Sequence, residues 1–216
     1  MNQPTGRSAR NTARRTAHLV AWMAIASAMC FAGGCSKKIS VGLPPGLAED
    51  EARRLNVARQ LASEAQSIKD PSRAAEKYKD AVREYREFPS AWTNLGVLMM
   101  NDQQYLQAAE AFNTAAELDA TDPRPLYNLG LLYDRRGYLR EARSYYEKAL
   151  DRDDNFLPAL RGVIRADSLL SEGSSQTLRW LERALMLEQD RKWQEWMRLQ
   201  KARIESLPAV RAHEQF

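Results

Sequence analysis

Hydrophobic side chains recur every three or four positions along residues 50–207. One such stripe begins with Trp92 and Leu95, and a second contains Leu126, Leu129 and Tyr133. This period is that of a helix buried on one side, whereas a half-buried strand would alternate at every second residue. The pattern predicts nine helices and no strands, with turns of about three to five residues between the helices.

The stripes belong to a longer repeat. The segment PSAWTNLGVLMM from Pro89 aligns with PRPLYNLGLLYD from Pro123 at an offset of 34 residues. The second half of the unit recurs at the same offset, in segments that begin at Ala74, Ala108 and Ala142. A unit of two helices leaves an apolar side exposed when it stands alone, so successive units are expected to stack into a solenoid.

Four positions of the repeat indicate how the helices pack. The eighth position is small, so that the two helices of a unit can approach closely: Ala62, Gly96 and Gly130. The twentieth is small and is expected to face the eighth: Ala74, Ala108 and Ala142. The twenty-fourth is a ring that fills the space between units: Tyr78, Phe112 and Tyr146. The twenty-seventh is small where the next unit packs: Ala81, Ala115 and Ala149. This pattern resembles the tetratricopeptide repeat, which implies an all-α, right-handed α-solenoid of helix–turn–helix units.

A fourth unit follows with a weaker match to the repeat. Leu160 and Val163 continue the apolar stripe, and Ala184 occupies the late small position. Ile164, however, stands where the earlier units have a small residue. Its bulk is expected to splay this helix pair.

The last predicted helix, over residues 190–207, is amphipathic. Its apolar residues include Trp193, Trp196, Met197 and Leu199. Because a solenoid needs a terminal element with a polar outer face, this helix is expected to act as a cap. The prediction is therefore about four tetratricopeptide units over residues 50–190, followed by a capping helix and tail over residues 191–216.

The first 34 residues have the pattern of a signal peptide. Residues 1–17 carry four arginines and no acid, and residues 19–32 are apolar apart from one serine. This apolar segment is short for a membrane span, which needs about 20 residues. Small residues precede Cys35 in the segment FAGGCS, which resembles a bacterial lipobox. The resemblance implies a lipoprotein signal peptide over residues 1–34 and a lipid, such as palmitate, on Cys35; an uncleaved membrane anchor and a chance match are the alternatives.

Other roles for Cys35 lack partners in the sequence. The second cysteine, Cys30, lies inside the apolar segment, and His213 is the one histidine after it, so neither a disulfide nor a metal site is expected. Residues 35–49 include Pro-Pro-Gly and are predicted to form a flexible tether behind the lipidated cysteine. Ser36 resembles a signal for sorting to the outer membrane, which places the chain at its periplasmic face.

The positive charge of the chain lies at its N-terminus. The chain has 32 Lys and Arg against 28 Asp and Glu, and four of the arginines precede Cys35. The remainder is neutral, so the sequence pI of about 9.1 does not favour a nucleic-acid partner. The sequence shows no phosphate-binding loop, no catalytic set and no cluster of metal ligands. It predicts a protein that is not an enzyme, has no cofactor and takes no small-molecule substrate.

The surface expected to bind partners is the concave one, which the first helix of each unit lines in this family. The residues at the corresponding positions are Arg59, Gln60, Asn94, Asn101, Arg124, Tyr127, Asn128, Arg135, Arg161 and Arg165. Because arginine binds carboxylates bidentately, an acidic segment is the expected ligand. Arg59, Asn94 and Arg124 match in part a clamp for a C-terminal carboxylate, in which Ser63 and Asn128 replace the two other expected residues. Alternatively, the asparagines are only typical of the repeat and the arginines keep the surface solvated.

The sequence thus predicts a membrane-anchored interaction scaffold of the bacterial cell envelope. Lipoproteins of this architecture serve pilus assembly, secretion, outer-membrane protein insertion or the control of cell-wall enzymes, and the sequence does not choose among these. The alternative is a peptide-binding co-chaperone or cargo adaptor that recognises acidic segments or C-terminal carboxylates.

Overall fold

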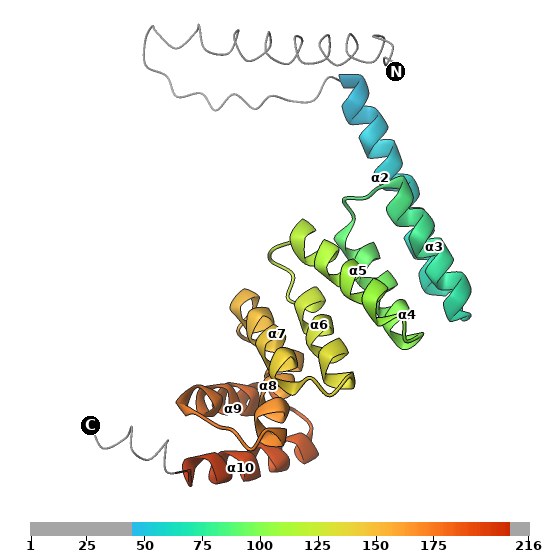
Figure 1. Ribbon diagram of the computed structural model, residues 1–216. Helices are drawn as coiled ribbons and strands as arrows, with labels where there is room; N and C mark the ends of the chain where they lie inside the picture. The colour runs from blue at the N-terminus through green and yellow to red at the C-terminus, as the bar shows by residue number, and fades with distance from the viewer. Residues whose placement is uncertain (1–44, 208–216) are drawn as a thin grey trace, which may run out of the picture. The chain divides into compact units, whose positions relative to one another are not determined.

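The computed structural model describes residues 45–207, and in that range every regular element is an α-helix (Figure 1). The nine helices are α2 (Pro45–Ser67), α3 (Pro71–Glu84), α4 (Pro89–Asn101), α5 (Tyr105–Leu118), α6 (Arg124–Arg135), α7 (Leu139–Arg152), α8 (Leu157–Leu169), α9 (Ser175–Leu187) and α10 (Arg191–Glu205). The prediction of nine helices and no strands is confirmed for these residues. The expected signal peptide and Cys35 lie outside the described residues.

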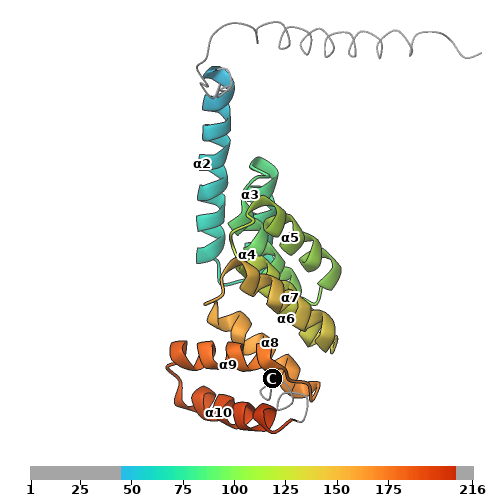
Figure 2. The same cartoon turned by 90° about the vertical axis from the view of Figure 1, so that its left-hand side faces the viewer.

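The first described helix starts earlier than the sequence predicted. Residues 45–49, assigned to the flexible tether, belong to α2. The rest of the predicted tether lies outside the described range. α2 has 23 residues against 14 in α3, and its N-terminal part extends past its partner (Figure 2).

The helix starts follow from local sequence. Proline stands in the first turn of α3, α4, α6 and α8, where a missing backbone N–H leaves no hydrogen bond unmade. The Asp70 carboxylate accepts hydrogen bonds from the backbone N–H of Ser72, at 2.9 Å, and of Arg73, at 3.2 Å, and so caps α3. Ser174 and Thr177 form a capping box at the start of α9.

Consecutive helices pack as pairs. The most extensive contacts lie within α2–α3, α4–α5 and α6–α7, which are the first three predicted units. The α8–α9 pair makes less extensive contact. Ile164 is fully buried in α8, so the weaker packing of this pair agrees with the splaying expected from its bulk.

The repeated positions are buried, but one of their contacts differs from the prediction. Gly130 was expected to face Ala142. A Cβ built on Gly130 would instead lie 2.5 Å from ring carbons of Tyr146, and one built on Gly162 in the next unit would lie 2.8 Å from the same ring. Tyr146 is fully buried. The small residues of α6 and α8 therefore make room for this ring, which joins units three and four.

The helix α10 closes the C-terminal end of the core. Met197 and Ile204 are buried there, and Ile204 packs over Gly173 in the turn before α9. Trp193 and Trp196 are partly buried against the same core. Leu199, predicted to belong to the apolar side, is 69% exposed. The capping helix is present, and Ile204 rather than Leu199 completes its buried side.

Candidate functional site

The first helices of the units form one side of the solenoid. α4 contacts α6, and α6 contacts α8, whereas no two second helices of neighbouring units contact each other to the same extent. Closer approach between first helices marks the inner side of a curved array. We call the surface formed by α2, α4, α6 and α8 the inner surface, and it carries the residues predicted to bind a partner.

At the N-terminal end of the inner surface the predicted residues are exposed. The side chain of Arg59 has no hydrogen bond or ion pair with any residue in the range 45–207, and Gln60 donates a hydrogen bond to Glu64 at 3.1 Å. In the next two units, Arg135 donates to the side-chain oxygen of Asn101 at 3.1 Å. Arg59 is therefore available to a ligand, and the Asn101–Arg135 pair links α4 to α6.

Arg124 is held by an acid from its own turn. Its guanidinium contacts both oxygens of Asp122, at 2.8–3.0 Å. The Arg124 side chain is 60% exposed, whereas that of Asp122 is only 9% exposed. The hydrogen bond to Asp122 raises the pKa of Arg124 above its ordinary value. The sequence predicted that Arg124 binds a carboxylate of the ligand. In the structure, the guanidinium edge that would make these two hydrogen bonds is already occupied by Asp122.

The two arginines of α8 are also paired within the chain. Arg161 donates two hydrogen bonds to Glu188, at 2.7 and 2.6 Å, and Arg165 forms an ion pair with Asp134 of α6. Burial alone would raise the pKa of Glu188, but hydrogen bonds from the Asp190 N–H and from Arg161 outweigh it and lower that pKa. Glu188 thus stays ionised beneath Arg161.

The asparagines and Tyr127 in the middle of the inner surface have different roles. Asn94 donates its amide N–H to the hydroxyl of Tyr78 at 3.1 Å. Asn128, one repeat later, has no such partner because the corresponding ring is Phe112. Tyr127 packs against Tyr146 with ring centres 5.8 Å apart, and burial raises its pKa. Asn94 and Tyr127 therefore support the fold. The half-buried Asn128 amide is not held by a tyrosine hydroxyl in the way that Asn94 is.

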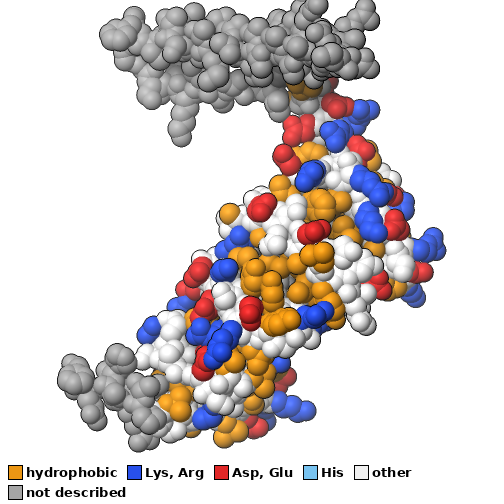
Figure 3. Space-filling model, in the orientation of Figure 1, with side chains coloured by type: hydrophobic (Ala, Val, Ile, Leu, Met, Phe, Trp, Pro, Cys, Tyr) orange, Lys and Arg blue, Asp and Glu red, His pale blue; other side chains and the backbone are white. Residues whose placement is uncertain are grey.

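Taken together, these pairs change the expected charge of the inner surface. The arginines of the first helices, which led us to expect an acidic ligand, would make this surface positive if they were unpaired. The anions come instead from loops and helix ends, chiefly Asp122 and Glu188. Figure 3 shows acidic and basic side chains interspersed along the face in view. Asp122 stands two residues from Arg124, so its pairing was visible in the sequence; Glu188 lies 27 residues from Arg161 and gave no local signal.

A buried polar network lies behind the inner surface, between units three and four. Asp167 is fully buried in α8. It accepts a hydrogen bond from the Thr177 hydroxyl at 2.6 Å and forms an ion pair with Arg143 of α7. Arg143 also contacts Glu147 at 2.9 Å. One carboxylate therefore ties α7, α8 and α9 together, a role that no local pattern in the sequence indicates.

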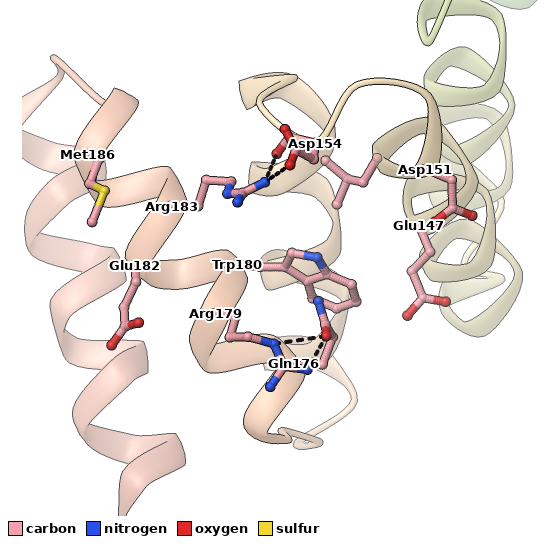
Figure 4. Close-up of a pocket in the computed structure, with 10 residues that line it drawn as sticks. Glu147, Asp151, Asp154, Gln176, Arg179, Trp180, Glu182, Arg183 and Met186 are labelled. Atoms are coloured by element: carbon pink, nitrogen blue, oxygen red, sulfur yellow. Dashed lines mark hydrogen bonds and ion pairs between the residues drawn. The ribbon is translucent and has the colours of Figure 1, made fainter. Parts of the chain in front are cut away.

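A pocket of about 750 Å³ lies on the other side of the solenoid, between α7 and α9. Figure 4 shows Glu147 and Asp151 facing Trp180 across the opening. Arg183 pairs with Asp154, and Arg179 contacts Gln176. Most of the charged groups that line this pocket are thus satisfied within the chain, which leaves little for a charged ligand to bind.

Residues 45–207 contain neither a candidate metal site nor a helix that could span a membrane. No group of three or more His, Cys, Asp or Glu side chains in that range could hold a metal ion. None of the helices there is both long enough and apolar enough to cross a bilayer.

Comparison with protein families identifies the repeat. Residues 89–122 and residues 123–156 each match a model of the tetratricopeptide repeat. The two matches begin at Pro89 and Pro123, which are the starts of the second and third units in the sequence analysis. The chain therefore carries tetratricopeptide repeats, and the predicted register is confirmed for these two units. A search of curated proteins finds no match.

Solved structures share the fold at low sequence identity. The crystal structure of MamA is 21% identical with a TM-score of 0.56, over 68% of this chain and 86% of that one. PilF of Pseudomonas aeruginosa is 16% identical with a TM-score of 0.52, over 74% and 69%. The first tetratricopeptide domain of Spaghetti (RPAP3), bound to the HSP90 peptide SRMEEVD, is 18% identical with a TM-score of 0.51, over 54% and 98%. At these identities the likeness establishes a shared tetratricopeptide solenoid.

Proposed function

We propose that the tetratricopeptide repeats of this chain form a protein-binding scaffold, held at a bacterial envelope membrane by a lipid on Cys35. The observation that carries the binding role is the inner surface. It brings exposed or half-buried polar side chains from four successive units to one side of the solenoid. Such an array suits an extended partner surface better than a small molecule, because its groups are spread over several helices.

The charge pattern of the inner surface defines the partner further. Most of its arginines are neutralised by acids of the chain, whereas Arg59 is exposed without a partner among residues 45–207. We therefore expect partner binding to depend on shape and hydrogen bonding along α4 and α6, together with the positive charges of Arg59 and of Arg135, whose partner Asn101 is neutral.

The test is capture of a partner from envelope membranes by the full chain, followed by charge reversal at two matched arginines. Arg59→Glu on the inner surface should weaken the isolated complex by about two- to fivefold, since an exposed charge pair contributes modestly. Arg73→Glu in α3 is the control, because Arg73 is also exposed and its side chain is also unpaired within residues 45–207. Equal affinity losses at both sites, measured by titration calorimetry, would show that the partner docks elsewhere.

A second candidate is a peptide-binding co-chaperone or cargo adaptor. It is favoured by the position of Arg59 and by the unoccupied amide of Asn128, which remain able to bind a peptide. It is weakened by the pairing of Arg124 with Asp122. The same capture experiment separates the two: one stoichiometric partner supports the scaffold, and many unfolded or acidic clients support the adaptor.

The anchor is tested independently of the partner. If Cys35 is lipidated, the mature chain begins at that residue, and its intact mass exceeds that of residues 35–216 by the mass of the lipid. Cys35→Ser should leave an unprocessed chain without lipid. Mass spectrometry of the membrane-extracted protein is the measurement; an unmodified Cys35, or an N-terminus at Met1, would contradict the anchor. Fractionation of the two envelope membranes then tests the proposed location at the periplasmic face of the outer membrane.

A further inference from the structure

A second pocket lies between α8, which is the first helix of the fourth unit, and the capping helix α10. It has a volume of about 400 Å³ and is lined by Arg165, Ser168 and Leu169 of α8 and by Lys192, Trp193 and Trp196 of α10. We call it the tryptophan pocket. It adjoins the inner surface, because Arg165 belongs to both. Its size is that of a site for a small ligand or a single anchoring side chain.

The two rings that line the tryptophan pocket are held by contact with each other and with Arg161 of α8. Trp193 and Trp196 meet edge to face, with ring centres 5.4 Å apart and planes at 85°. The Arg161 guanidinium lies 4.9 Å from the centre of the Trp193 ring and is itself held by Glu188. Because these contacts hold the rings in place, the pocket is preformed, and a ligand loses little free energy in ordering it.

The pocket exposes apolar surface that a capping helix would ordinarily hide. Leu169 is 56% exposed, and both tryptophans are only partly buried. Aromatic side chains that are half buried around a concave space are the usual anchors of protein interfaces. The apolar walls therefore favour a large apolar side chain as the occupant.

The charged groups that line the pocket are cations, which donate hydrogen bonds. Lys192 is exposed, and its ammonium group has no partner among residues 45–207. Arg165 is 43% exposed, and its partner Asp134 is only 9% exposed. The nearby Asp190 is occupied by the backbone N–H groups of α10, at 2.8 Å to Lys192. No carboxylate lines the pocket itself. Because Arg165 is paired with Asp134, Lys192 is the cation of the pocket that is available to an acid on the ligand.

We propose that the tryptophan pocket is a docking site for a partner protein segment in which a large apolar side chain stands next to an Asp or Glu. The apolar side chain would lie against Trp193, Trp196 and Leu169, and the carboxylate would accept a hydrogen bond from Lys192. This inference goes beyond the proposed function, because it holds whether or not the chain is anchored and whichever partner occupies α2 to α6. A lipid surface is less suited to the site, since a membrane-binding helix presents its apolar side chains outward rather than around a concavity.

The test uses a fluorescein-labelled peptide with the sequence Gly-Ser-Glu-Phe-Ser-Gly and an amidated C-terminus, titrated with the full chain and followed by anisotropy. Replacing Phe by Ala in the peptide, or Glu by Gln, should each weaken binding by roughly fivefold or more. The Phe-to-Ala change removes the apolar contact, and the Glu-to-Gln change removes the charge. Absence of binding, or equal binding of all three peptides, would overturn the proposal.

Two matched pairs of variants locate the site. Lys192→Glu should weaken the peptide complex by roughly tenfold, whereas Arg191→Glu, one residue away and outside the pocket, should change it less than about twofold. Leu169→Ser should weaken it by roughly threefold, whereas Leu199→Ser, at a residue that is also exposed, should leave it unchanged. Equal losses within either pair would contradict the assignment.

A vesicle arm separates the alternative ligand. The same variants are tested for sedimentation with vesicles of phosphatidylglycerol and phosphatidylcholine. If the vesicles bind and Lys192→Glu and Leu169→Ser abolish that binding while the peptide does not bind, the pocket is a membrane contact and the peptide proposal is wrong. Failure of the peptide leaves the scaffold proposal untouched, because that proposal is tested at Arg59 with an isolated partner.

Discussion

Replacing Gly130 by leucine is expected to cause a large loss of stability. A Cβ alone would lie 2.5 Å from the ring of Tyr146. That ring cannot yield, because it is fully buried and Gly162 of the next unit lies close to it as well. Overpacking at such a site should lower the free energy of unfolding by about 3 kcal/mol or more. Urea denaturation followed by circular dichroism measures the loss.

A double-mutant cycle shows whether the ring is the cause. Tyr146→Ala should itself cost about 3–5 kcal/mol, since it leaves a large cavity. Gly130→Leu should then cost less in the Tyr146→Ala background than in the original chain, because the clash has been removed. Ile164→Leu, a volume-conserving change at a fully buried position, should cost less than about 1.5 kcal/mol. Additive losses in the cycle would contradict the contact between Gly130 and Tyr146.

Replacing Asp167 by alanine is the second large effect. The change leaves the half-buried Arg143 with Glu147 as its remaining acid, and it removes the acceptor for the Thr177 hydroxyl. Breaking a buried ion pair by deleting one partner costs about 3–5 kcal/mol, because the other charge stays partly desolvated. The expected result is a lower free energy of unfolding with loosened packing of α7, α8 and α9, measured by urea denaturation and by hydrogen exchange of these helices.

An exposed ion pair of the same type provides the control. Glu172 contacts Arg140 at 2.7 Å, and the side chains are 44% and 76% exposed. Glu172→Ala should therefore cost less than about 1 kcal/mol. If Asp167→Ala and Glu172→Ala lower the free energy of unfolding equally, the expectation that burial strengthens the Asp167 network is wrong.

The candidate site was only partly visible in the sequence. The 34-residue period placed Arg59, Asn94 and Arg124 on first helices, and the structure has them there. The period could not show that Arg161 meets Glu188, which follows α9, or that Arg165 meets Asp134 of the preceding unit, since each pair joins residues about 30 positions apart that only the folded chain brings together. Charge counted along the first helices alone therefore overestimated the positive charge of the inner surface.

What the sequence by itself determined about this protein is its repeating local structure. The apolar period fixed the helices, proline and capping residues fixed where several of them begin, and the offset between Pro89 and Pro123 fixed the unit. Ala108, Phe112 and Ala115 are fully buried as predicted. These features are readable because they depend on residues within one turn or one unit, where helix geometry sets which side chains lie together.

Only the tertiary structure decided how the fourth unit and α10 pack, because there the chain departs from the period that set the earlier contacts. In the fourth unit Gly162 makes room for the Tyr146 ring, whereas in the earlier units the small residue at position eight has that role. Leu199 of α10 is exposed to solvent. Leu169 and Trp193 come together although they are far apart in the chain. Contacts between elements depend on the separation and crossing of helices, which side-chain volumes across the whole core determine together. For that reason the tryptophan pocket is a property of the folded chain and of no single segment.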